Sequence, residues 1–595
     1  MSARFVVGID LGTTNSVLAY SSLAEETPSV HVLPIPQLVA PSTLESRPQL
    51  PSFLYLASEH ETGQGALDLP WAEARRFAVG EIARRQAAEV PDRTIGAVKS
   101  WLCHGRVDRR SEILPWNAPA EVPRISPVVG TRRFLEHLIA AWQDAFPDAP
   151  LAEQHVVLTV PASFDAAARE LTREAALAAG LPDEVLLLEE PQAAVYSWVG
   201  KVGERWRRSL ALGDVLLVCD VGGGTSDFTL VRVGEEDGEL VLQRVAVGNH
   251  LLVGGDNMDL ALAYQASQLF AAKNVELDPW QSVSLWHSCR AAKEAMLREG
   301  GPERQTISVL GRGSKLIGGT VSIELDRQQT AEWLVEGFFP RCEPHERPAR
   351  RRASGFQEIG LPFEQDTGVT RHLAAFLQDH AEGQGGAVQP THLLMNGGTF
   401  KARILADRLV DVLAGWSGGR APQWLEADPD LDYSVARGAA YYGWAKQRGG
   451  VRIRGGTARS YYVGIETAGL TIPGAPRPLR ALCVAPLGME EGDQADVPSA
   501  EIGLVVGEPA QFRFFSSPVR KQDQVGDVLS RWSPDELAET DSLETTLEPE
   551  EGIEEPYVPV KFQSRVTELG MFELWCVSTT SDKRWKLEFN VREEP

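Results

Sequence analysis

The sequence lacks paired cysteines, long apolar runs and a surplus of basic residues. Its six cysteines form no C-x-x-C pair, so neither a zinc site nor a disulfide framework is indicated and buried thiols are expected. No apolar stretch approaches the roughly 18 residues that span a bilayer, and a strand-like run at residues 5–10 stands where a signal peptide would be. The net charge of −24 disfavours binding to nucleic acid or anionic lipid. We therefore expect a cytoplasmic protein without nucleic-acid or membrane partners.

Two common nucleotide-binding motifs are also missing. No G-x-x-x-x-G-K-[ST] loop follows a strand, and no G-x-G-x-x-G opens a helix. A Walker-type phosphate loop and a dinucleotide fingerprint are therefore excluded as motifs.

The remaining composition is that of a globular protein with more than one domain. The chain has 595 residues, of which 43% are hydrophobic and 24% charged. In the first part, strand-like runs alternate with helical stretches, which indicates an α/β fold. The expected strands are 5–10, 16–20, 156–160, 185–188 and 215–219, and the expected helices are 71–89, 132–146 and one that Asp165 caps and Gly180 ends.

Several segments are expected to lack regular structure or to change its type. Residues 28–51 read as loop and edge strand, 339–365 as an insertion loop that includes three arginines at 350–352, and 449–456 as a linker. The later runs 461–465, 481–485, 511–515, 571–577 and 585–591 suit a β-sandwich. Between them, residues 535–555 contain acids and no Lys or Arg, and we expect a solvated loop.

Two stretches resemble each other across the chain. Residues 8–16 read G-I-D-L-G-T-T-N-S and residues 219–227 read C-D-V-G-G-G-T-S-D. Glycines let backbone N–H groups approach phosphate oxygens, and threonine hydroxyls donate further hydrogen bonds. Aspartates repel phosphate, so a hydrated Mg²⁺ is implied between them. One such turn is weak evidence, but two equivalent copies predict two facing hairpins that hold a triphosphate.

These motifs resemble the phosphate loops of the heat-shock-70 chaperone family, of divergent bacterial type. Further matches follow in order: V-L-T-V-P-A-S-F at 157–164, E-E-P-Q-A-A at 189–194, G-G-D-N-M-D at 254–259, C-R-A-A-K-E at 289–294, N-G-G-T-F-K at 396–401, V-A-R-G-A-A at 435–440 and Y-V-G-I-E-T-A-G at 462–469. The resemblance is specific over about residues 5–445 and thinner beyond.

The resemblance implies a fold and its domains. An actin-like ATPase domain of two ribonuclease-H-like lobes is expected over residues 1–448, with lobe I at about 1–205 and lobe II at about 206–448. A linker at 449–458 and a β-rich substrate-binding domain at 459–595, without a helical lid, would follow.

The resemblance also implies roles for single residues. Asp10, Glu190 and Asp220 would hold Mg²⁺ through water, and Asp220 and Thr225 would orient the attacking water. Pro161 and Arg169 would relay the nucleotide state to the rear domain. The residues expected to contact ATP are Gly12, Thr13, Thr14, Asn15, Gly222, Gly223, Gly224, Thr225, Lys293, Gly397, Gly398 and Thr399.

The chain departs from the family pattern at three places. The catalytic lysine of the family is matched by Arg84 in G-E-I-A-R, and arginine is not interchangeable with lysine at a close phosphate contact. Arg84 would stabilise charge on the γ-phosphate, with nearby Lys99 as the alternative cation. Glu294 stands in place of an arginine near adenine, and the short basic linker differs from the family's acidic one.

Three functions remain open from the sequence. The first is a slow ATPase that couples nucleotide state to binding of hydrophobic peptide or protein clients, with a co-chaperone or nucleotide-exchange factor as partner. The second is a nucleotide-sensing scaffold with little turnover, which Arg84 favours. The third is a small-molecule kinase of the same superfamily, which would need a catalytic base for a substrate hydroxyl.

Overall fold

The computed structural model describes residues 3–104, 107–116, 118–236, 238–310, 320–349, 361, 363–381, 386–425, 430–451, 453–454, 456–457, 459–466, 479–490, 492–546, 557–567 and 571–590. The arginine run at 350–352, the 467–469 part of the rear motif and residues 547–555 of the acidic segment lie outside this description.

Two six-stranded sheets repeat one strand order. The first runs β11-β10-β1-β2-β3, with β6 also paired to β2, and the second runs β18-β17-β12-β13-β14-β19. In each sheet three consecutive strands pair antiparallel, β1-β2-β3 in the first and β12-β13-β14 in the second. Two further strands pair parallel on one side, β10 and β11 in the first and β17 and β18 in the second. The strands are β1 (Phe5–Leu11), β2 (Asn15–Ser22), β3 (Val30–Val32), β6 (Leu50–Pro51), β10 (His155–Val160), β11 (Leu186–Glu189), β12 (Val215–Val221), β13 (Ser226–Glu236), β14 (Glu239–Val247), β17 (His392–Asn396), β18 (Gln423–Trp424) and β19 (Ile453–Arg454). This repeat agrees with the expected pair of lobes.

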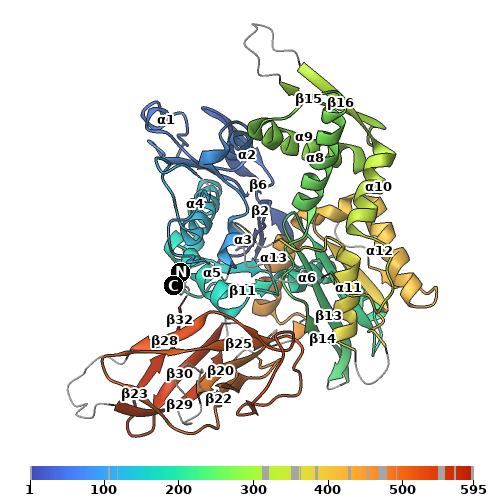
Figure 1. Cartoon of the computed structure of the whole chain (residues 1–595). Coiled ribbons are helices and arrows are strands. Elements are labelled where there is room, and N and C mark those ends of the chain that lie inside the picture. The colour runs from blue at the N-terminus through green and yellow to red at the C-terminus, as the bar shows by residue number, and fades with distance from the viewer. Residues whose placement is uncertain are drawn as a thin grey trace, which may run out of the picture.

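Two helices join the lobes at the base of the gap between them. These are α6 (Glu190–Val202) and α13 (Ser434–Arg448), which cross near the centre of Figure 1. Their backbones approach so closely that a Cβ at Gly438 would collide with the carbonyl oxygen of Ala193. Glycine is therefore required where these helices cross.

Further helices and small sheets surround each lobe. Lobe I carries β4 (Ile35–Ala40), β5 (Thr43–Arg47), β7 (Leu54–Leu56), α1 (Glu59–Gly63), β8 (Phe77–Val79), α2 (Glu81–Glu89), β9 (Thr94–Ile95), α3 (Val98–Leu102), α4 (Pro127–Ala145) and α5 (Ala166–Ala179). The short helix α7 (Trp206–Ser209) follows, and its Trp206 shares a core cluster with Val231 and Leu242 of lobe II. Lobe II carries α8 (Gly255–Ala271), α9 (Pro279–Leu297), β15 (Arg304–Leu310), β16 (Thr320–Asp326), α10 (Arg327–Phe338), α11 (Val369–Asp379) and α12 (Arg403–Trp416).

Local capping signals placed some helix ends well and missed others. The Asp165 side chain accepts from the Ala168 N–H at 2.8 Å, and Gly180 ends α5 at φ 102°, both as predicted. The single helix expected over 71–89 is wrong. Strand β8 pairs with β7 instead, and Gly80 at φ 89° separates that strand from α2. Residues 28–51 also form more strand than expected, because β4 and β5 make a hairpin.

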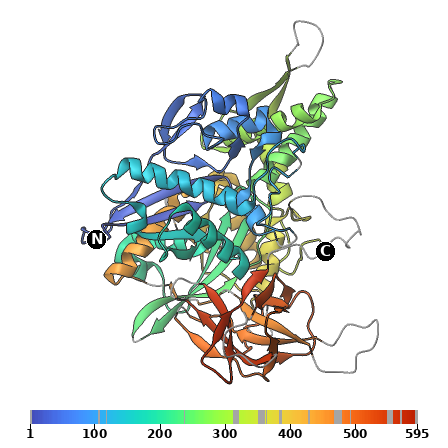
Figure 2. The ribbon, with the colours of Figure 1, turned by 90° about the vertical axis from the view of Figure 1, so that its left-hand side faces the viewer.

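The rear part is rich in strands and lies below both lobes in the two ribbon views (Figures 1 and 2). One sheet has the order β26-β21-β20-β25-β27, a second β22-β29-β30-β31 with β23 beside β29, and a third β24-β28-β32. The strands are β20 (Ser460–Glu466), β21 (Leu479–Ala485), β22 (Gln494–Asp496), β23 (Ile502–Val505), β24 (Pro509–Phe512), β25 (Phe514–Ser517), β26 (Val528–Leu529), β27 (Ala538–Glu539), β28 (Ser542–Thr546), β29 (Tyr557–Val566), β30 (Phe572–Ser578), β31 (Arg584–Lys586) and β32 (Glu588–Asn590). Stacked Tyr461, Phe514 and Phe572 fill its centre.

Two strands expected in the rear are each divided between sheets. Residues 511–515 split into β24 and β25, and 585–591 split into β31 and β32 as far as they are described. Chains that turn at the corner of a sandwich change sheets in this way. The acidic segment is not a simple loop either, since β28 pairs with β24 and β32.

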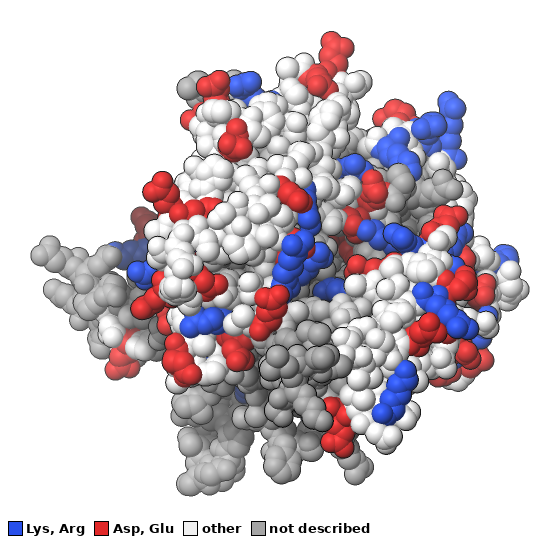
Figure 3. All heavy atoms as spheres, turned by 90° about the horizontal axis from the view of Figure 1, so that it is seen from above, with Lys and Arg blue, Asp and Glu red and all other residues white. Residues whose placement is uncertain are grey.

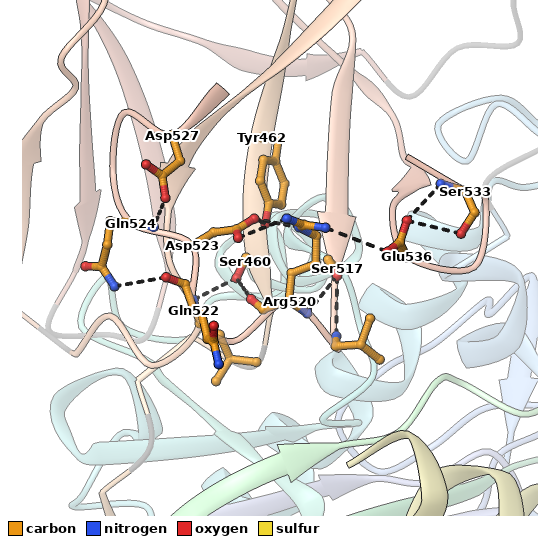
Figure 4. Close-up of polar contacts among 12 residues, drawn as sticks. Ser460, Tyr462, Ser517, Arg520, Gln522, Asp523, Gln524, Asp527, Ser533 and Glu536 are labelled. Carbon is orange, nitrogen blue, oxygen red and sulfur yellow. Dashed lines mark hydrogen bonds and ion pairs between the residues drawn. The ribbon is translucent and has the colours of Figure 1, made fainter. Parts of the chain in front are cut away.

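A polar network ties the loop after β25 to strand β20 (Figure 4). Arg520 donates to both oxygens of Asp523 at 2.6 and 3.1 Å, and the Tyr462 hydroxyl donates to the same carboxylate at 2.6 Å. The Ser460 hydroxyl donates to the Arg520 carbonyl at 2.8 Å. The loop is therefore held by side chains rather than by strand pairing alone.

The rear part contacts both lobes. Arg109 of lobe I forms an ion pair with Asp541 at 2.5 Å, with both side chains buried. On lobe II, the His380 imidazole lies 3.4 Å from the Pro518 carbonyl oxygen. Met571 belongs to the hydrophobic core cluster of lobe I. Front and rear thus share both apolar and charged contacts.

Candidate nucleotide site

The tips of two equivalent hairpins meet across the gap between the lobes. The β1–β2 hairpin carries Thr13 and Thr14, and the β12–β13 hairpin carries Gly223 and Gly224. A Cβ at Gly223 would collide with the Thr14 hydroxyl, and one at Gly224 would come within 2.7 Å of the Thr13 methyl. The two sequence copies therefore form one site, with backbone and hydroxyl donors on both sides.

A cavity of about 490 Å³ opens at these hairpins and extends into lobe II. Seen from above, basic and acidic side chains border the hollow between the lobes (Figure 3). The cavity brings together nearly all the residues expected at the site: Asp10, Gly12, Thr13, Thr14, Asn15, Arg84, Glu190, Asp220, Gly222, Gly223, Thr225, Lys293, Gly397, Gly398 and Thr399. Gly224 does not line it and lies behind the tip, next to Thr13.

Three carboxylates lie behind the hairpins at one end of the cavity. Burial, and then repulsion by Glu190, raise the pKa of Asp10 to about 7 and that of Asp220 to about 8. Burial likewise raises the pKa of Glu190, against the attraction of Lys99. A cation placed among these groups would favour their ionised forms.

The donor set fits a hydrated ion better than direct ligation. Asp220 accepts from the Asn396 amide at 2.8 Å and Asp10 from the Thr159 hydroxyl at 3.3 Å, so both carboxylates are oriented. No group of three or more His, Cys, Asp or Glu side chains within the described ranges is close enough to hold a metal directly. Mg²⁺ keeps several of its waters in nucleotide sites.

Two buried polar atoms in the cavity lack a hydrogen-bond partner within the described part of the chain. Among the described side chains, the Thr14 hydroxyl and the Gln49 amide nitrogen are buried without a hydrogen-bond partner, and both residues line the cavity. Buried polar groups are normally satisfied, so these two favour a polar ligand there.

The loop after β17 closes the cavity beside the second hairpin. Gly397 has φ 90°, and a Cβ on it would collide with the Val221 carbonyl oxygen. The Thr399 hydroxyl donates to the Gly222 carbonyl at 3.1 Å. Only glycine allows this close approach of two backbone segments.

The lobe II end of the cavity is apolar with charged edges. Lys293 contacts the Asp259 carboxylate at 2.7 Å and donates to the Gly255 carbonyl at 2.9 Å. Arg290, which sequence reasoning missed, pairs with Asp256 at 2.5 Å. The apolar lining consists of Met258, Leu297, Ala402, Leu405, Leu431 and Val435. Such a surface suits a flat base, with Glu294 on its rim.

The two candidate cations occupy different surroundings. Lys99 on α3 contacts Glu190, and its side chain is 14% exposed. Arg84 on α2 pairs with Glu81 at 2.7 Å, and its side chain is 43% exposed. Both line the cavity, but only Lys99 touches the carboxylate end.

Of the two predicted relay residues, Arg169 borders the rear part, since it lines one cavity with Tyr461 and Phe572. Arg169 donates to Glu189 at 2.8 Å, and Glu189 also binds Arg244. A second connection was not predicted: the Ser163 hydroxyl donates to Asp227 of β13, and Arg459 of the rear part donates to the Ser163 carbonyl at 3.5 Å. Sequence spacing gives no signal for contacts at such separations.

Comparisons with known proteins find relatives over part of this chain. Residues 71–349 match the family model described as Hsp70 protein. The chain is 31% identical over 310 residues to a chaperone protein HscA homolog of Pseudomonas aeruginosa, covering 50% of this chain and 42% of that relative. It is 30% identical over 308 residues to the HscA homolog of Azotobacter vinelandii, covering 50% and 43%.

The matches therefore span less than half the length of these relatives, 42% and 43%. The expected resemblance to Hsp70 is confirmed, and so is the expected fold class, an actin-like α/β region followed by a strand-rich one. Within the described residues, no helix combines the length and the apolar character needed to cross a bilayer.

Proposed function

We propose, on the premise that the front of this chain is Hsp70-like, that the protein binds ATP with Mg²⁺ between its lobes and hydrolyses it slowly to control client binding. One observation carries the proposal: two hairpin tips rich in glycine and threonine face each other in one cavity with Asp10, Glu190 and Asp220 behind them. Proteins of this family are ATPases. Three carboxylates next to a phosphate chain require a cation between them.

Different groups of this site would bind the phosphates, the metal, the attacking water and the base. Backbone N–H groups and hydroxyls of the hairpins would bind the phosphates, and the carboxylates would hold the hydrated metal, which supplies positive charge at the phosphates. Asp220 and Thr225 would orient the attacking water. The apolar surface around Leu405 and Val435 would hold the base.

Calorimetry tests the first part of the proposal. ATP titrated into the whole chain with Mg²⁺ should bind at least tenfold more tightly than with EDTA, because the ionised carboxylates repel bare phosphates. Equal affinity in both buffers would contradict the metal-bridged site. A steady-state ATPase assay of the same sample would then measure turnover.

We further propose that the rear part binds an extended hydrophobic peptide, by main-chain hydrogen bonds at a sheet edge and apolar contacts. An acidic segment at 535–555 would favour basic clients, but three of its described acids are paired with arginines: Glu536 lies 3.8 Å from Arg520, Glu539 2.6 Å from Arg513, and Asp541 2.5 Å from Arg109. These pairs weaken the expected preference for clients with lysine.

Fluorescence anisotropy of labelled hydrophobic peptides tests client binding. The whole chain is titrated with peptides that carry flanking Lys or flanking Glu, with and without MgATP. Binding that weakens with MgATP would support coupling between front and rear. No binding in either condition would contradict the client proposal and favour the second function.

That second function is a nucleotide-sensing scaffold with little turnover. It is favoured by the position of Arg84, whose guanidinium pairs with Glu81 instead of a cleft carboxylate. A single-turnover assay separates the two functions, because a scaffold would bind ATP and release it unhydrolysed.

A further inference from the structure

We propose that Lys99 is the cation that contacts the γ-phosphate, in place of Arg84, which aligns with the family's lysine. Lys99 would move there from Glu190 when a hydrated divalent ion binds near that carboxylate. The proposal rests on the proposed function, since it assigns a role within the same site. It concerns a residue that lies 15 positions beyond Arg84, on another helix.

The first argument is position. The Lys99 ammonium contacts the Glu190 carboxylate, and the two side chains are only 14% and 13% exposed. Lys99 lines the large cavity together with Thr13 and Asp220. It is therefore already at the end of the cleft where the hairpin tips meet.

The second argument is the charge at this end of the cleft. The carboxylates of Asp10, Glu190 and Asp220 line the cavity, and the Lys99 ammonium contacts one of them. Buried carboxylates need positive charge close by, and Lys99 supplies it from a position next to the hairpin tips.

The third argument is that Arg84, which also lines the cavity, is engaged by a carboxylate of its own helix. Its guanidinium pairs with Glu81 on its own helix at 2.7 Å. Burial, then the charges of Arg290 and Arg84, lower the pKa of His287 on α9 to about 4. Arg84 therefore lies where α2 approaches α9.

The backbone around Lys99 is shaped for this placement. Ala97, the residue before α3, has φ 52° and ψ 32°, a left-handed conformation that costs a non-glycine residue energy. Such strained residues persist where the surrounding structure requires them, commonly at functional sites. Lys99 follows Ala97 by two positions, in the first turn of α3.

The chemistry needs a mobile cation and no proton transfer from it. Water adds to the γ-phosphorus while the bond to the β,γ-bridging oxygen breaks, ADP leaves with that electron pair, and the water proton goes to the phosphate released. Negative charge shifts toward the bridging oxygen, where an ammonium stabilises it. Glu190 would release Lys99 if a hydrated divalent ion supplied the positive charge that this carboxylate needs.

The test compares Lys99→Gln with Arg84→Gln in the whole chain, and uses Arg85→Gln as matched control. Arg85 is 53% exposed and pairs with the same Glu81. Lys99→Gln should lower kcat about a hundredfold or more, as loss of one charge-stabilising donor does. It should also lower affinity for ATP more than for ADP. Arg84→Gln should lower kcat less than tenfold.

A second measurement does not depend on turnover. In EDTA, Lys99→Gln should lower the melting temperature of the chain, since three buried carboxylates then lack their cation, and the added change Glu190→Gln should recover part of the loss. This double-mutant cycle measures the Lys99–Glu190 coupling directly.

The outcomes separate the two proposals. The assignment of Lys99 to the γ-phosphate would be overturned if Arg84→Gln lost turnover while the kcat of Lys99→Gln stayed within threefold of wild type. It would also be overturned if the double-mutant cycle showed no coupling between Lys99 and Glu190. If the cycle shows the coupling but the wild-type chain binds no MgATP, the proposed function is refuted. The role of Lys99 at a phosphate is then refuted with it.

Discussion

Burial controls how the acids at the carboxylate end of the cleft behave. Asp220 lies on β12 beside Asp10, and its pKa is raised to about 8 by burial and then by Glu190. Such a residue contributes to function through its charge and costs stability when ionised. Function and folding should therefore respond in opposite directions when it is changed.

We expect Asp220→Asn to lower MgATP turnover about a hundredfold while the melting temperature in EDTA stays the same or rises. The amide removes a charge that its neighbours repel, but cannot balance the metal. Steady-state ATPase assays and thermal melts of one sample check this. A fall in melting temperature that matches the loss of activity would show that Asp220 has mainly a structural role.

A buried histidine makes lobe I sensitive to acid. The His137 Nε2 donates to the Pro36 carbonyl at 2.9 Å, and burial, then Arg75, lower the pKa of its imidazole to about 3. The folded protein keeps this group neutral, whereas the unfolded chain takes up a proton below the ordinary histidine pKa of 6.5. Its contribution to stability is therefore present above 6.5 and is lost as pH falls toward 3.

We expect His137→Gln to remove this dependence, because glutamine keeps a donor and does not titrate. Between pH 7 and pH 5, the free energy of unfolding of the parent should fall by up to about 2 kcal/mol more than that of the variant. Urea unfolding at both pH values measures the difference. Parallel losses in parent and variant would contradict the assignment.

At the scale of elements, the loop between β17 and α12 depends on one glycine. Gly397 combines φ 90° with a backbone collision for any Cβ, whereas Gly419 has φ 92° and open space around it. A comparison of alanine variants at these two glycines therefore distinguishes the cost of a strained φ from the cost of a steric collision.

We expect Gly419→Ala to cost about 1 kcal/mol of stability from strain alone, and to leave nucleotide affinity unchanged. Gly397→Ala should cost more and weaken ATP binding at least tenfold, because the loop must move away from the second hairpin. Calorimetry and thermal melts of both variants check this. Equal effects of the two changes on affinity would show that the close approach is not needed.

At the scale of the whole molecule, front and rear are joined by a buried ion pair. Arg109 is fully buried and Asp541 is 8% exposed, with the charged groups 2.5 Å apart. Removing one partner leaves the other charge buried and unpaired, which typically costs about 3–5 kcal/mol.

We expect Asp541→Ala to release the rear part from lobe I, and the double change Arg109→Met with Asp541→Leu to restore much of the contact. Limited proteolysis between the two parts measures release, since an undocked linker is cut faster. Protection that is the same in the parent and in Asp541→Ala would show that the apolar contacts, including Met571, suffice to dock the rear part.

The sequence alone determined the features that arise from neighbours along the chain. Hairpin turns follow from glycine and threonine after an apolar strand, and the ends of α5 follow from Asp165 and Gly180, because turns and caps are made by residues a few positions apart. The repeat of residues 8–16 at 219–227 therefore predicted both hairpins, and the family resemblance that it began implied the two lobes. The same repeat also contains several of the residues that line the cleft, including Asp10, Thr13 and Asp220.

Only the tertiary structure decided which distant side chains meet. Lys99 reaches Glu190 across 91 positions, and Asp541 reaches the buried Arg109 across the boundary between front and rear. It also divided the 511–515 strand between two sheets, although its local pattern is continuous. These outcomes depend on how packed elements exclude water and bring charges together, and no local pattern in the chain carries that information.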